Sequence, residues 1–137
     1  MLRHDIIKRL IEKMATFLAR LAGLRADGQY EAIDGELQTI EQELGLPRGH
    51  ERLDARSLAL LLGSADKLAL ASILFWHRAE VAADRGQVAE AARLQLRAQA
   101  LCAHVVRGDL SPVTLGLFDG HPLAQGRATG EPPTTSH

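Results

Sequence analysis

Residues 65–106, ADKLALASILFWHRAEVAADRGQVAEAARLQLRAQALCAHVV, decide the fold of this chain. Apolar side chains recur at three- and four-residue intervals on both sides of Gly86, which is the spacing of an amphipathic α-helix. Because Gly86 marks a turn, we expect one helix over 65–85, a second over 87–106, and antiparallel packing between the two.

The helix expected over 65–85 is apolar on two sides, so it needs two neighbours and belongs at the centre of the fold. Its first stripe consists of Leu68, Ala71, Phe75, Ala79 and Ala82, and its second stripe of Leu70, Ile73, Leu74 and Val81. His77 continues the second stripe, and we interpret it as a partly buried histidine with one hydrogen-bonded ring nitrogen.

The helix expected over 87–106 also has two apolar sides. Its main stripe consists of Val88, Ala91, Leu94, Ala98, Leu101, Cys102 and Val105, and a second strip of mostly small residues consists of Ala92, Leu96, Ala100 and Ala103. A lone domain does not need this second strip. The C-terminal tail or a second copy of the chain could cover it, and it is also compatible with an ordinary exposed, alanine-rich helix face.

Two more helices are expected upstream, over Leu2–Leu24 and Tyr30–Leu44, joined by a turn at Asp27–Gly28. The first is rich in basic residues, and the second carries acidic residues but no basic one. Antiparallel packing would pair these charges, each exposed pair contributing about 0–1 kcal/mol, although separate acidic and basic partner sites are an alternative. A fifth, short helix begins after Asp54 and ends near Leu62.

Prolines gather near the C-terminus, which divides the chain into a folded helical domain, 1–107, and a non-helical tail, 108–137. Residues 110–123 are too apolar for a simple linker, and we expect them to lie extended over a groove of this chain or of another protein. Their anchors would be Val113, Leu115, Leu117 and Phe118. Residues 126–137 are expected to be disordered.

Composition excludes several classes of protein. The chain has 137 residues, of which 46% are hydrophobic, 24% charged and only 4% aromatic, as in one small, helical globular domain. A net charge of −1 provides no basic field for nucleic acid or an anionic membrane. The longest apolar run is shorter than the roughly 20 residues of a membrane span. The charged N-terminus argues against a signal peptide, so we expect a cytoplasmic protein.

Side chains that carry chemistry are scattered along the sequence. His77 and Glu80 share one helix side, but a third metal ligand is missing at this spacing. No Glu-x-x-His pair suggests a di-iron bundle, and no glycine-rich loop leads into a Lys-Ser or Lys-Thr pair. Cys102 lies at the edge of an apolar stripe and is interpreted as a small hydrophobe. We expect no catalysis, no metal and no cofactor.

The spacing of Ala79, Gly86, Ala91 and Ala98 resembles a tetratricopeptide repeat, in which small residues let two helices cross closely and a glycine makes the turn. Residues 1–106, which open with Asp5-Ile6-Ile7-Lys8-Arg9, also resemble a group of small, uncharacterised bacterial all-helical proteins. The resemblance implies antiparallel helical hairpins that bind peptides or partner proteins. It transfers no ligand-contacting residue.

We therefore expect an all-α domain of about five helices in antiparallel hairpins that serves as a non-catalytic protein–protein interaction or scaffold module. Its partner would be another protein or a second copy of the chain, with no nucleic acid and no membrane involved. The candidate interface consists of Leu70, Leu74, His77, Val81, Ala92, Leu96, Ala100, Ala103, Val113, Leu115, Leu117 and Phe118.

Two further expectations follow from this hypothesis and its alternative. If the tail forms the interface, Phe118→Ala or removal of residues 110–123 weakens partner binding or dimerisation. The alternative function is a regulatory module that binds a small molecule between the second stripe of the 65–85 helix and the loop 45–54.

Overall fold

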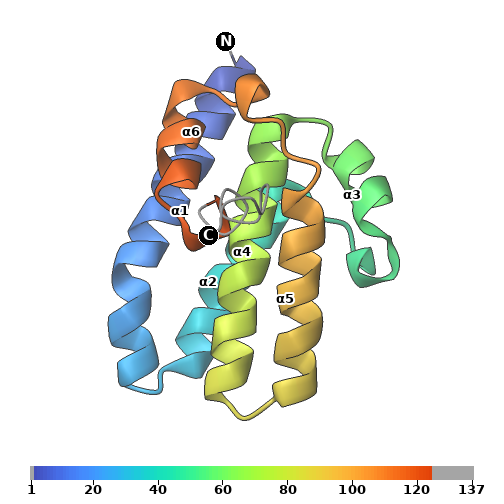
Figure 1. The fold of residues 1–137 in the computed structure, drawn as a ribbon. Coiled ribbons are helices and arrows are strands. Elements are labelled where there is room, and N and C mark those ends of the chain that lie inside the picture. Colours follow the sequence, from blue (N-terminus) through green and yellow to red (C-terminus); the bar gives the residue numbers. More distant parts are fainter. Residues whose placement is uncertain (1, 125–137) are drawn as a thin grey trace, which may run out of the picture.

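The computed structural model describes residues 2–124 (Figure 1). No strand occurs in that range, so the all-α prediction is confirmed. The elements are α1 (Leu2–Ala26), α2 (Tyr30–Leu44), the 3₁₀ helix η1 (His50–Arg52), α3 (Ala55–Leu62), α4 (Ala65–Asp84), α5 (Val88–Cys102), the 3₁₀ helix η2 (Arg107–Asp109) and α6 (Pro112–Asp119).

Helix α4 lies at the centre of the fold, as its two apolar stripes predict. It packs against α1, α2, α3, α5 and α6, and α5 is its most extensive partner (Figure 1). Every residue from 68 to 75 is buried, because neighbours cover this helix on all sides. The one polar residue in that stretch is Ser72. Its hydroxyl donates a hydrogen bond to the carbonyl of Leu68 at 2.9 Å, so its buried O–H group is satisfied.

Local sequence signals set the helix ends. The Asp54 carboxylate accepts the backbone N–H of Ser57 at 2.7 Å, and the Ser64 hydroxyl accepts that of Lys67 at 3.2 Å. Between these two caps, Gly63 adopts a φ of +71°, a left-handed conformation that favours glycine. Helix α3 therefore ends and α4 begins within three residues.

Opposite charges on α1 and α2 face each other, as the antiparallel arrangement predicts. Lys13 pairs with Glu43, and Arg20 pairs with Glu36 at 2.9 Å. These surface pairs align the two helices but contribute about 0–1 kcal/mol each. The acidic face of α2 also contacts α4, because the Glu41 carboxylate pairs with the Arg78 guanidinium.

The prediction of a non-helical tail over 108–137 is wrong for residues 108–109, which belong to η2, and for residues 112–119, which form α6. In the sequence, the prolines argue against a helix. Pro112 is compatible with one, because it occupies the first turn of α6, where its missing N–H breaks no helical hydrogen bond. Ser111 caps this helix through the N–H of Thr114 at 3.4 Å, and its own N–H donates to Asp66 on α4 at 2.9 Å.

The expected domain boundary after residue 107 also disappears in the structure. Helix α6 packs on α1 and α4, and Leu110, Phe118 and Leu123 belong to the same hydrophobic core as the long helices. Residues 110–123 thus dock on their own chain, and residues 112–119 do so as a helix rather than in the extended conformation that we expected. The expected disorder of residues 126–137 concerns a segment outside the described residues.

Candidate functional site

A chain of hydrogen-bonded histidines joins α4 to the residues that follow α6. The Nε2 atoms of His77 and His121 are 2.8 Å apart, and Nδ1 of His77 is 2.8 Å from Oε1 of Glu80. At the other end, Nδ1 of His121 accepts the backbone N–H of Leu123 at 3.1 Å. Trp76 packs edge-on against the His121 ring, with the ring centroids 5.7 Å apart.

These partners fix the position of each ring proton. Because Nδ1 of His121 is an acceptor, its proton resides on Nε2 and is donated to Nε2 of His77. The proton of His77 then resides on Nδ1 and is donated to Glu80. The His121 ring is neutral in this arrangement, and a further proton on its Nδ1 would break the hydrogen bond from Leu123.

Burial, reinforced by the neighbouring His77 ring, lowers the pKa of His121 to about 4 from its ordinary value of 6.5. The hydrogen bond from His77 lowers the pKa of Glu80. Arg25 of α1 lies 3.4 Å from Glu80 and forms a two-point pair with Asp84, which extends the cluster from α4 to α1. The contacts of this cluster fasten α1, α4 and the C-terminal segment together.

A polar cleft of about 370 Å³ opens between α2, η1, α4 and α5. It is lined by Glu41, His50, Glu51, Phe75, Arg78, Glu90, Arg93, Leu94 and Arg97. Arg97 donates from its two terminal nitrogens to the carbonyls of Leu53 and His50, and its guanidinium lies 5.9 Å from the centre of the Phe75 ring. These contacts tie the loop after α2 to α5 and hold the guanidinium in place.

Two polar groups in the cleft, Arg97 and His50, lack full compensation for their burial. Burial and the neighbouring Arg93 lower the pKa of Arg97, so its charge is held at a cost in free energy. His50 is buried, with Nε2 3.5 Å from the Glu41 carboxylate, and its Nδ1 has no hydrogen-bond partner among the described residues. Such an unsatisfied buried nitrogen costs about 1–3 kcal/mol.

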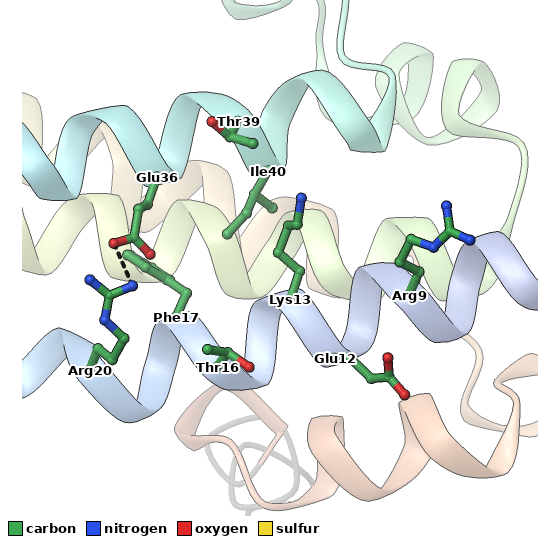
Figure 2. A pocket seen from close by; sticks show the side chains of 9 residues that line it. All are labelled: Arg9, Glu12, Lys13, Thr16, Phe17, Arg20, Glu36, Thr39 and Ile40. Carbon is green, nitrogen blue, oxygen red and sulfur yellow. Dashed lines mark ion pairs between the residues drawn. The ribbon is translucent and has the colours of Figure 1, made fainter.

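A second hollow, a groove of about 440 Å³ between α1 and α2, is shown in Figure 2. Phe17 and Ile40 are its apolar residues, and Arg9, Lys13 and Arg20 provide positive charge. Arg20 points across the groove to Glu36, as the dashed line in Figure 2 marks, and Lys13 pairs with Glu43. The charges are thus largely used to join the two helices, and the groove is open.

The structure scatters the candidate interface residues. Leu70, Leu74 and Val81 are buried in the core and are no longer candidates for a partner surface. His77 is partly buried with both ring nitrogens bonded, where the sequence predicted one. Of the tail residues, Phe118 is fully buried, Leu115 and Leu117 are half-buried, and Val113 is exposed. The strip on the outer side of α5 is exposed: it consists of Ala92, Leu96, Ala100 and Ala103.

Sequence patterns did not reveal three polar residues that organise these sites. His121 lay in the segment expected to be extended, and its partner His77 is 44 positions away. The sequence does not single out Arg97, because helical periodicity does not show that its guanidinium reaches backbone carbonyls across a loop. His50 had no periodic neighbour at all, since it sits in a short 3₁₀ turn.

Comparison of the chain with protein-family models, with curated proteins and with solved structures finds no match. Within residues 2–124, no three His, Cys, Asp or Glu side chains are grouped so that they could hold a metal ion. None of the helices described is long and apolar enough to span a bilayer.

Proposed function

We propose that this protein is a non-catalytic interaction module that associates with a second copy of itself through the outer strip of α5. The observation that carries this proposal is the exposure of large apolar side chains around that helix. Leu96 and Val88 on α5 are 67% and 76% exposed, and Leu60 on the adjoining α3 is 75% exposed. Leu96 belongs to the outer strip itself, whereas Val88 lies on the other stripe of α5, and exposed apolar strips are common at protein contact surfaces.

The strip is complementary to itself. Leu96 lies between Ala92 and Ala100, which are one helical turn away on either side and leave room for a neighbouring knob. If two α5 helices pack antiparallel about Leu96, Ala92 of each copy faces Ala100 of the other. Arg93 then faces Gln99 of the second copy, so the centre of the contact contains no like-charge pair.

The position of the C-terminal segment supports a second copy of the chain as the occupant of the exposed strip on α5. The sequence left two ways to cover the α5 strip, namely the tail and another chain. Through Ala124 the tail packs on α1 and α4, and α6 lies on the side of the molecule away from α5 (Figure 1). Phe118, the buried anchor of this segment, lies in the hydrophobic core. We therefore propose a second copy of the chain as the occupant of the exposed strip.

We also propose that the α4–α5 hairpin is tetratricopeptide-like. Ala79 and Ala98 are buried where the two helices pack closely, and Gly86 turns the chain with a φ of +77°. Hairpins of this kind leave a helix face for partner binding, which agrees with the exposed strip on α5.

The proposal is tested by measuring molar mass by light scattering and sedimentation. We expect the wild-type protein to show a concentration-dependent dimer. Leu96→Glu is expected to weaken dimerisation at least tenfold, because it removes a leucine whose burial is worth about 1.5–3 kcal/mol and places a charge in the contact.

The matched control is Val113→Glu, which places the same charge at an exposed apolar residue of α6. It is expected to leave the dimer intact. A wild-type protein that stays monomeric at about 200 μM contradicts the proposal. Loss of the dimer in Val113→Glu but not in Leu96→Glu would move the interface to α6.

A further inference from the structure

We propose that the cleft between α2, η1, α4 and α5 binds a small organic oxyanion, a carboxylate or a phosphate ester, through Arg97 and Arg93. Arg93 lies at the edge of both this cleft and the proposed dimer contact, whereas Arg97 lines the cleft and is not part of that contact, so Arg97 reports on ligand binding separately from the dimer. At about 370 Å³ the cleft falls within the range of roughly 300–1,000 Å³ of small-molecule pockets.

The cleft lining holds three arginines and three glutamates, but the arginines are not all directly paired. Arg78 is neutralised by Glu41, at 2.8 Å, and Arg93 by Glu90. Arg97 forms no ion pair with any described residue, because its hydrogen bonds go to backbone carbonyls. The remaining carboxylate of the lining, Glu51, is exposed to solvent. Asp54 and Glu51 attract Arg97 electrostatically without a direct ion pair, so an anion beside Arg97 would add the direct pair that the described residues do not supply.

Arg97 is also positioned in advance. A guanidinium has five N–H groups in a fixed plane, and the two carbonyl bonds use only two of them. Those bonds and the Phe75 ring below hold the remaining N–H groups in one orientation, so little conformational entropy is lost when a ligand binds.

Arg93 lies one helical turn before Arg97 on α5, which places both guanidiniums on one side of the helix. Its pair with Glu90 is an exposed contact within one helix, and such pairs are weak. Arg93 can thus exchange Glu90 for a ligand oxygen. Two guanidiniums at this spacing suit the forked geometry of a carboxylate or phosphate.

His50 gives a second indication of a ligand. It lines the cleft, it is more than nine-tenths buried, and its Nδ1 lacks a partner among the described residues. The loop 45–54 thus forms one wall of the cleft, as the small-molecule hypothesis from the sequence expects. The opposite wall uses Phe75 and Arg78 of α4, whereas the sequence pointed to the buried Leu70 and Leu74.

The test is a nuclear magnetic resonance titration that follows the Nε–H signals of the arginine side chains. Inorganic phosphate and malonate serve as separate probes, and sodium chloride keeps the ionic strength constant so that screening does not change. We expect saturable shifts of Arg97 and Arg93 with a Kd on the order of 1 mM for at least one probe. Saturation by phosphate alone assigns a phosphate ester, and saturation by malonate alone assigns a carboxylate.

Three variants make the test specific. Arg93→Gln and Arg97→Lys are each expected to weaken binding at least tenfold. Arg93→Gln alters an exposed residue and leaves the loop anchor in place, so it is informative even if Arg97→Lys is unstable. Arg56→Gln, an equal charge change on the exposed side of α3, is the control and is expected to bind like wild type. The proposal is overturned if neither probe saturates, or if Arg56→Gln binds as weakly as Arg93→Gln.

Discussion

Mild acid is expected to lower the stability of this protein through His121. The ring is neutral in the folded protein, where its pKa is about 4, whereas an unfolded histidine titrates near 6.5. The unfolded state therefore binds a proton more readily, and stability falls as pH decreases from about 6.5 towards 4. Above pH 6.5 the full stabilisation is present, and below pH 4 this residue contributes no further loss.

The size of the effect follows from these two pKa values. At pH 5, most unfolded molecules carry the proton and most folded molecules do not, which corresponds to about 2 kcal/mol. Solvent reaches part of the site and screens the interaction, so we expect a loss of about 1–2 kcal/mol between pH 8 and pH 5. This window lies above the range in which Glu80 takes up its proton, since the pKa of that carboxyl is lowered.

The assay is urea unfolding followed by the fluorescence of Trp76, the only tryptophan of the chain, which packs against the His121 ring. The variant His121→Asn removes the titrating group, and its amide oxygen can still accept the N–H of Leu123. Its unfolding free energy should change by less than about 0.5 kcal/mol over the same pH range. Exposed His104→Asn is the control and should follow wild type. Equal pH slopes for wild type and His121→Asn would refute the reasoning.

Two further predictions concern stability alone. Phe118→Ala should lower the unfolding free energy by about 3–5 kcal/mol in urea denaturation, because this fully buried ring fills the space between α6 and the core, and a loss below 1 kcal/mol would show that α6 is not docked in solution. Asp54→Ala should lower it by about 1 kcal/mol by removing the cap of α3, whereas Asp54→Asn, which can still accept the N–H of Ser57, should retain most of the stability.

The long elements could be predicted because each carries a repeated apolar pattern. Both stripes of α4 appear in its sequence, and their burial on all sides follows from that pattern. Single-residue signals also sufficed where the partner is local, as for Asp54 and Ser64, whose caps reach only three residues along the chain. In these cases the energy that selects the conformation comes from residues close together in sequence.

Contacts between distant polar residues could not be predicted in the same way. His77 with His121, and Arg97 with the loop carbonyls, depend on where two elements meet in space, and no periodicity encodes that meeting. Helix α6 was missed for a different reason. Its short sequence contains a proline and a glycine, and its burial is determined by a groove between α1 and α4 that exists only after the longer helices have packed.

The position of α6 in the core changes the effect that we expect from deleting residues 110–123. The sequence suggested that Phe118 or the segment 110–123 contacts a partner, so that deletion would weaken binding directly. In the structure this segment completes the core against α1 and α4, whereas the exposed strip lies on α5. Deletion would uncover the groove and break the His77–His121 link, so it should first lower stability and promote non-specific association. A truncated protein that keeps its stability yet loses the dimer would assign the contact to the tail after all. One that is destabilised but dimerises as before at a temperature where it is folded would leave α5 as the contact.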